Sequence, residues 1–201
     1  DLQKKALDEA VKLSKRGSLT SHGILQRIQK ISEGKAEMPQ ESSNAKIFNK
    51  VMWNLDRIDE KDFYTLGFGE WEIKQFVRLL KKTKIKTLVD VRDTPFSQYK
   101  PEFNKNNLAK VCHENDVKYI HIQKLGVPFE IRQKLAKTLD YNWFFNWYDK
   151  NVLSNGILES EDFNSIDFPI AIMCTEFDPT KCHRHRIALE LEKKGLKGFD
   201  L

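Results

Sequence analysis

The feature that most constrains the fold of this chain is an unbroken apolar run, Ile170 to Met173, within the segment 168–174. A strand that is apolar at consecutive positions is buried on both faces, which is typical of a parallel sheet covered by helices. Shorter apolar stretches at 63–69, 86–93 and 117–122 predict three more strands. The sequence therefore predicts a sheet whose strands are mostly parallel.

Segments with a helical spacing of apolar residues separate these strands. The alternation of strands and helices predicts an α/β domain over residues 61–201, with a mainly parallel sheet sandwiched by helices. A last edge strand is expected in residues 196–201. The expected helices are 71–80, 106–114, 131–139, 143–148 and 183–194.

Residues 1–60 predict a helical N-terminal segment in front of this domain. Apolar residues spaced by three or four predict two short helices within 1–34, and residues 47–55 predict another helix. The stretch near 35–45 is polar, without periodicity, and typical of a linker. The first two helices form a hairpin that offers a surface for a protein partner.

Composition narrows the classes of function. Lysine and arginine total 34 against 29 acidic residues, a net charge of +5, which is compatible with nucleic acid or a phosphorylated ligand. No apolar run approaches the roughly 20 residues of a membrane-spanning helix, so no membrane partner is expected. Three cysteines are too few for a disulfide scaffold, and their odd number favours a reducing, cytoplasmic location.

Polar clusters follow three of the predicted strands. The first is the turn at Gly67–Gly69, the second runs from Asp90 through Tyr99, and the third runs from Cys174 to Arg184. Ligands bind beyond the carboxyl ends of parallel strands, and these ends share one edge of the sheet. We therefore expect the three clusters to converge on a single pocket.

The residue types in these clusters predict an anion-binding catalytic site. Arginines at two strand ends supply forked donors that suit a phosphate. Carboxylates provide general acids and bases, histidines carry protons near neutral pH, and a cysteine can act as a nucleophile. The candidate catalytic residues are Asp90, Glu176, Cys174 and His121, and the candidate substrate-binding residues are Arg92, Ser97, Tyr99, Cys182, His183 and Arg184.

These residues support a hydrolase or transferase, or a degenerate enzyme, that acts on a nucleotide or a nucleic-acid-like anionic substrate. The alternative is a non-catalytic module that binds nucleic acid or protein, since aromatic residues interleaved with lysines can stack on unpaired bases. Chemistry of the rhodanese or cysteine phosphatase kind is disfavoured. It places an arginine six positions after the cysteine, and the residue six positions after Cys174 is Thr180.

Simpler interpretations of the same residues stay open. Asp90 and Arg92 can form a structural ion pair, and Cys174 can be a small core residue. Cys174, Cys182, His183 and His185 are also zinc-ligand types within twelve positions. The spacing lacks the paired cysteines of structural zinc sites, and adjacent Cys182 and His183 are expected to point in different directions. No cofactor is predicted, and zinc stays an alternative.

Four blocks of the sequence match a known pattern. They are Thr65–Gly67, Leu88–Arg92 with Pro95, Ser97, Tyr99, Pro101, Phe103 and Asn104, then Tyr119, His121, Leu125 and Gly126, and the pattern Cys-x-Glu-x-x-Pro-x-x-Cys-His-Arg at Cys174–Arg184. Through these blocks, residues from about 64 to 201 resemble the domain-of-unknown-function 488 family. Phe68 and Gly69 depart from the family's His or Tyr followed by Ser, and Val127 replaces a glycine. The resemblance implies an α/β fold with clustered polar residues and implies no established reaction.

Overall fold

The computed structural model describes residues 43–56 and 59–201. The two helices expected within 1–34, and most of the expected linker, lie outside the described residues. None of the helices in the described ranges is long and apolar enough to cross a membrane.

A five-stranded sheet lies at the centre of the fold, and all of its strand pairs are parallel. The strand order is β3-β2-β4-β1-β5, so β4, the fourth strand along the chain, lies in the middle of the sheet. The α/β prediction is confirmed, with every expected strand present. The strands are β1 (Phe63–Gly67), β2 (Thr87–Asp90), β3 (Lys118–His121), β4 (Ile170–Cys174) and β5 (Gly198–Asp200).

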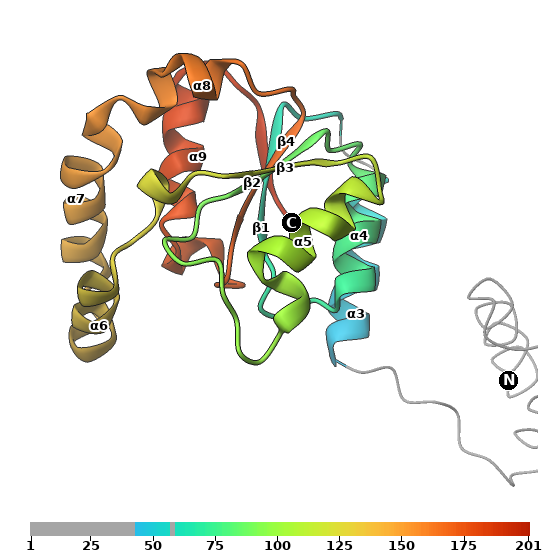
Figure 1. Cartoon of the computed structure of the whole chain (residues 1–201), viewed down its shortest axis with the longest axis horizontal. Coiled ribbons are helices and arrows are strands. Elements are labelled where there is room, and N and C mark those ends of the chain that lie inside the picture. The colour runs from blue at the N-terminus through green and yellow to red at the C-terminus, as the bar shows by residue number, and fades with distance from the viewer. Residues whose placement is uncertain (1–42, 57–58) are drawn as a thin grey trace, which may run out of the picture. The chain divides into compact units, whose positions relative to one another are not determined.

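Helices cover both faces of the sheet (Figure 1). The first core lies on the face covered by α3, α4 and α5, and the second core lies on the face covered by α7 and α9. Alternate residues of β4 enter the two cores: Ala171 and Met173 the first, and Ile170, Ile172 and Cys174 the second. This double burial is the physical reason for the unbroken apolar run. The helices are α3 (Ser43–Leu55), α4 (Ile73–Lys82), α5 (Lys105–His113), α6 (Phe129–Thr138), α7 (Tyr141–Asn151), α8 (Glu161–Asn164) and α9 (Arg184–Lys193).

Helix α3 belongs to the α/β unit. Its Phe48 and Leu55 are buried in the first core, and the Phe48 ring packs edge-on against Trp71 with centroids 6.0 Å apart. The compact unit spans Lys46–Leu201, so its boundary lies near residue 45 and not near residue 60 as the sequence predicts. The reason is that the apolar face of α3 is buried against the sheet domain.

The connection between α7 and β4 contains short helical pieces that the sequence does not predict. Helix α8 has four residues and is preceded by two 3-10 turns. Such pieces are too short to show a helical period. They bury Leu158 and Phe163 in the second core, and Ile166, just after α8, is buried there too.

The sheet opens a crevice where β2 and β4 lie side by side. Strand β2 leads into α5, which packs on the first core, whereas β4 leads into α9, which packs on the second core. Neighbouring parallel strands whose following helices lie on opposite faces leave a crevice at their carboxyl ends. The fold therefore places the segments after β2 and β4 at one potential binding site.

The segment after β4 packs closely against Gly67 at the end of β1, and a substitution at Gly67 tests this packing. A Cβ added at this position would overlap the backbone carbonyl of Glu176. We expect Gly67→Ala to lower the free energy of unfolding by about 1–3 kcal/mol, the usual cost of overpacking. Urea titration measures the free energy of unfolding. An unchanged midpoint would show that the Glu176 segment moves away from the added methyl group without loss of stability.

Candidate functional site

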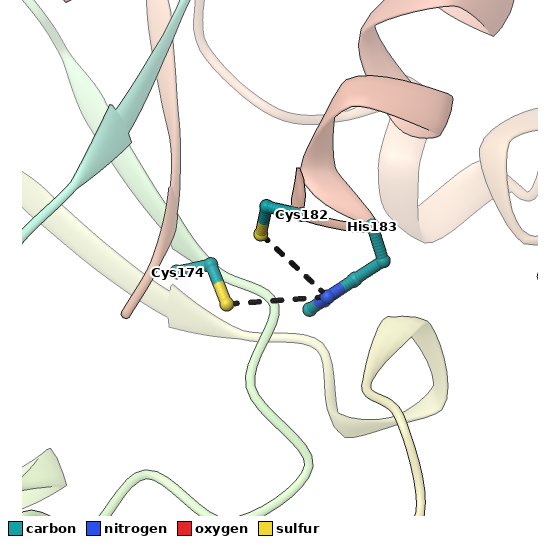
Figure 2. Close-up of side chains that lie close together, drawn as sticks. All are labelled: Cys174, Cys182 and His183. Atoms are coloured by element: carbon teal, nitrogen blue, oxygen red, sulfur yellow. Dashed lines mark hydrogen bonds between the residues drawn. The ribbon is translucent and has the colours of Figure 1, made fainter. Parts of the chain in front are cut away.

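Two cysteines and a histidine meet at the carboxyl end of β4. Cys174 is the last residue of that strand, and Cys182 and His183 immediately precede α9. Figure 2 shows their side chains pointing toward one another. The Nδ1 atom of His183 lies 4.0 Å from the Sγ of Cys174 and 3.8 Å from the Sγ of Cys182. All three residues are buried, and their donor atoms, within 4.8 Å of one another, could hold a metal ion.

The local backbone explains why Cys182 and His183 face the same point. Cys182 is extended, with φ −122° and ψ 143°, whereas His183 already has helical angles of −60° and −24°. The change between the two conformations turns both side chains toward Cys174, so the prediction that they diverge is wrong. His185 lies instead beside another hollow, with Thr65 and Asp200, outside this cluster.

Glu176 adds a carboxylate to the cluster. Its Oε2 accepts hydrogen bonds from the thiols of Cys174, at 2.9 Å, and Cys182, at 3.2 Å. Glu176 is exposed as a residue, but its carboxyl group is turned inward. Arg184 braces the segment that carries it, because its buried guanidinium donates to the carbonyls of Glu176 and Phe177.

The backbone of the segment after β2 orients the His183 ring. Its Nε2 lies 3.0 Å from the carbonyl oxygen of Val91. A carbonyl oxygen only accepts hydrogen bonds, so Nε2 carries a proton. In the neutral ring, Nδ1 then presents its lone pair to the two sulfurs.

Charge is distributed unequally in the cluster. Burial opposes ionisation of Cys182, but its hydrogen bond with Cys174 and the charge of His183 hold the pKa of the Cys182 thiol well below its ordinary value. The hydrogen bond with Cys182, followed by burial, raises the pKa of Cys174. Burial and the charge of Cys182 raise the pKa of Glu176. Cys182 is therefore the more acidic of the two thiols.

Asp90 and Arg92 form a buried ion pair. The Arg92 Nε and Nη2 atoms donate to the two carboxylate oxygens of Asp90, at 2.9 and 2.6 Å. Tyr119 donates to the same carboxylate at 2.7 Å, and Nη2 also reaches the carbonyl of Phe103. The structural ion-pair interpretation is thus confirmed. The remaining Arg92 nitrogen, Nη1, is buried and has no hydrogen-bond partner within the described residues.

A cavity of about 100 Å³ lies over the cluster. Arg132 from α6 and Lys181 from the segment before α9 border it. Arg92 also lines the cavity, although Asp90 and the Phe103 carbonyl hold its guanidinium. Two partly exposed cationic residues therefore lie beside the buried cluster. The lining residues are Arg92, Asp93, Thr94, Phe96, Val127, Arg132, Leu135, Phe144, Cys174, Thr175, Glu176, Lys181, Cys182 and His183.

The other predicted site residues do not line this cavity. Asp90 and Arg184 are buried and act on their neighbours, Arg92 and the Glu176 segment. His121 lies beside a different hollow, and its Nε2 contacts the carbonyl of Arg92. Ser97 belongs to a turn, where its backbone N–H donates to the side chain of Asn104, and Tyr99 is 92% exposed. The structure thus brings together Arg92, Cys174, Glu176, Cys182 and His183.

Arg132 and Phe96 are among the cavity residues that the sequence prediction does not include. Arg132 belongs to a helix without buried residues, and nothing in its sequence indicates which strand end it approaches. Phe96 lies between Arg92 and Ser97 in a largely polar loop, and an aromatic residue in such a loop is a signal that the sequence offers. In the structure its side chain is exposed. Lys181 lies within the third polar cluster that the sequence predicts, but the prediction gives it neither a catalytic nor a binding role.

Comparison with known proteins gives a family and no activity. A family model described as "Domain of unknown function DUF488" matches residues 72–191, which include the whole cluster. No curated protein and no solved structure matches the chain.

The Asp90–Arg92 ion pair predicts a large stability difference between two matched variants. Asp90→Asn leaves a buried guanidinium charge without its counterion, and we expect it to cost about 3–5 kcal/mol of unfolding free energy. Asp149→Asn removes the partner of Arg186 from a surface pair whose side chains are 26% and 31% exposed, and it should cost about 1 kcal/mol. Denaturant titration measures the free energy of unfolding of both variants. Equal losses would contradict the prediction that the Asp90–Arg92 pair stabilises the fold more than the Asp149–Arg186 pair.

Proposed function

The chain belongs to the DUF488 family, whose description names no reaction, and from the site itself we propose a hydrolase or transferase that acts on the anionic group of a nucleotide or nucleic-acid-like substrate. One observation carries the proposal. The cavity combines cationic walls with a floor of acidic, basic and nucleophilic groups. Binding and reacting groups therefore face the same small space.

The cationic wall supports binding of an oxyanion. Asp90 and the Phe103 carbonyl already hold the Arg92 guanidinium, which packs over the Phe68 ring of the first core. The charges available to a ligand in the cavity are therefore those of Arg132 and Lys181. Their side chains are partly exposed and can close around an anionic group.

The volume of the cavity limits what can enter. About 100 Å³ accommodates a few water molecules, and hence a group the size of phosphate. A whole nucleotide does not fit, so the rest of the substrate would lie outside. Phe96 lines the cavity and is 67% exposed, so its ring offers a stacking surface for a base at the mouth.

The floor supplies groups for the chemical step. Hydrolysis requires a group that takes a proton from the attacking water. The Glu176 carboxyl has a raised pKa and lies on the floor beside both thiols, which suits it to this role. The pKa of the Cys182 thiol is lowered, which favours its acting as a nucleophile.

Substitution of the wall cations tests the proposal. We expect Arg132→Gln and Lys181→Gln each to weaken binding of a phosphate-bearing substrate about tenfold, because each removes a charge-assisted contact worth roughly 1.4 kcal/mol or more. Calorimetry with phosphate and nucleoside monophosphates, and turnover of phosphate esters and single-stranded oligonucleotides, provide the measurements.

Two variants serve as matched controls. Arg78 lies over the Phe48 ring as Arg132 lies over Phe129. Lys110 and Glu114 form a solvent-exposed pair at the end of α5, as Lys181 and Asp178 do before α9. Arg78→Gln and Lys110→Gln should leave binding unchanged. Equal binding by all four variants rules out the cavity as the anion site, and binding without turnover of any substrate favours the non-catalytic alternative.

A further inference from the structure

We infer that Cys174, Cys182 and His183, with Glu176 as a fourth and exchangeable ligand, bind one zinc ion at the floor of the cavity. The metal site itself is argued from geometry and donor chemistry. Its catalytic consequence rests on the function proposed above. The structural basis is the convergence of four donor atoms from the end of β4 and the start of α9.

The distances between the donor atoms suit a tetrahedral site. Zinc bonds of about 2.0–2.3 Å to nitrogen, oxygen and sulfur imply separations of roughly 3.3–3.8 Å between neighbouring ligand atoms. The His183 Nδ1 lies 3.8 and 4.0 Å from the two sulfurs, and the Glu176 Oε2 lies 3.2 and 2.9 Å from them. Small side-chain adjustments would place all four atoms around one ion.

The chemistry of the donor set favours zinc. Thiolate and imidazole together are preferred zinc ligands, whereas magnesium and calcium prefer oxygen. The Val91 carbonyl holds the proton of the His183 Nε2, which leaves Nδ1 as the ligand atom. A carbonyl or carboxylate partner on the second ring nitrogen is a recurrent feature of metal-binding histidines.

The inward-turned carboxyl group of Glu176 has no cationic side chain beside it. Within the described residues no lysine or arginine forms an ion pair with this carboxyl group, which meets the two sulfurs instead. Arg184, the nearest arginine in sequence, binds the Glu176 backbone carbonyl instead. A divalent ion would neutralise the charges of these ligands.

A disulfide between Cys174 and Cys182 is the competing explanation. The two Sγ atoms lie within 4.8 Å of each other, and both cysteines are free thiols. A disulfide accounts for two sulfurs that lie close together. It does not account for an imidazole nitrogen and a carboxylate oxygen aimed at the same point.

The four ligands differ in how firmly they are held. Cys174, Cys182 and His183 are buried, whereas Glu176 belongs to an exposed segment that borders the cavity. Three protein ligands with a fourth position open to water are the arrangement of catalytic zinc sites. If water replaces the Glu176 carboxylate, zinc supplies an acidified water facing the cavity, and the released carboxylate can accept its proton.

Metal analysis of the full, untagged chain tests the inference. We expect elemental analysis to find one zinc per chain, and Cys174→Ser, Cys182→Ser and His183→Asn each to lose it. Cys112→Ser is the matched control, since Cys112 is a buried free cysteine in the first core and should retain the metal. Glu176→Gln should retain one zinc, because three ligands remain, but release it faster to a chelator.

A measurement on the wild-type chain guards against variants that fail to fold. A thiol-blocking mercurial is titrated while a chromogenic chelator reports released zinc, and we expect one zinc to appear as two thiols react. Wild-type chain that holds no stoichiometric zinc after incubation with zinc salts overturns the inference. Zinc that stays bound after Cys174 and Cys182 have reacted with the mercurial also overturns the inference. A Cys174–Cys182 disulfide in the chain as isolated does the same.

The outcomes separate this inference from the proposed function. Anion binding that depends on Arg132 and Lys181 in a chain without zinc would overturn the metal site alone. Stoichiometric zinc in a chain that binds no phosphate-bearing ligand would leave the metal site standing and remove the proposed function.

Discussion

The parallel pairing of β2 with β4 is the interaction on which the site depends. Asp90 lies opposite Met173, and the N–H of Val91 continues the ladder by donating to the Met173 carbonyl. This register brings the residues after β2 beside Cys174. The Val91 carbonyl then orients His183, so one stretch of backbone both closes the sheet and positions the imidazole. A shift of one residue in this register would separate the two halves of the site.

The fold was largely accessible from sequence, because burial on two faces leaves a clear pattern. Strand β4 is apolar at every position because its side chains point alternately into the two cores. Short helices such as α8 were not accessible, because four residues carry no period. The boundary near residue 45 was also missed, because the helical pattern of α3 does not reveal which core its apolar face joins.

The site was accessible only in part. The rule that ligands bind at strand ends identified the correct edge of the sheet, and the spacing from Cys174 to Arg184 identified the richest cluster. The rule does not say which face a given residue takes, so Asp90 and His121 were assigned to the pocket although neither lines it. Arg132 reaches the cavity through tertiary packing of α6, which no local pattern encodes. Buried polar residues such as Arg184 position the others and look identical in sequence to ligand-binding residues.

The central place of β4 has a consequence for synthesis of the chain. Strands β1 and β2 are not neighbours, because β4 lies between them and is made about 80 residues after β2. A chain emerging from the ribosome therefore presents two apolar strands whose shared partner has not yet been translated, a state prone to aggregation. The middle of the sheet and the cysteine–histidine cluster would form together, late, when β4 inserts.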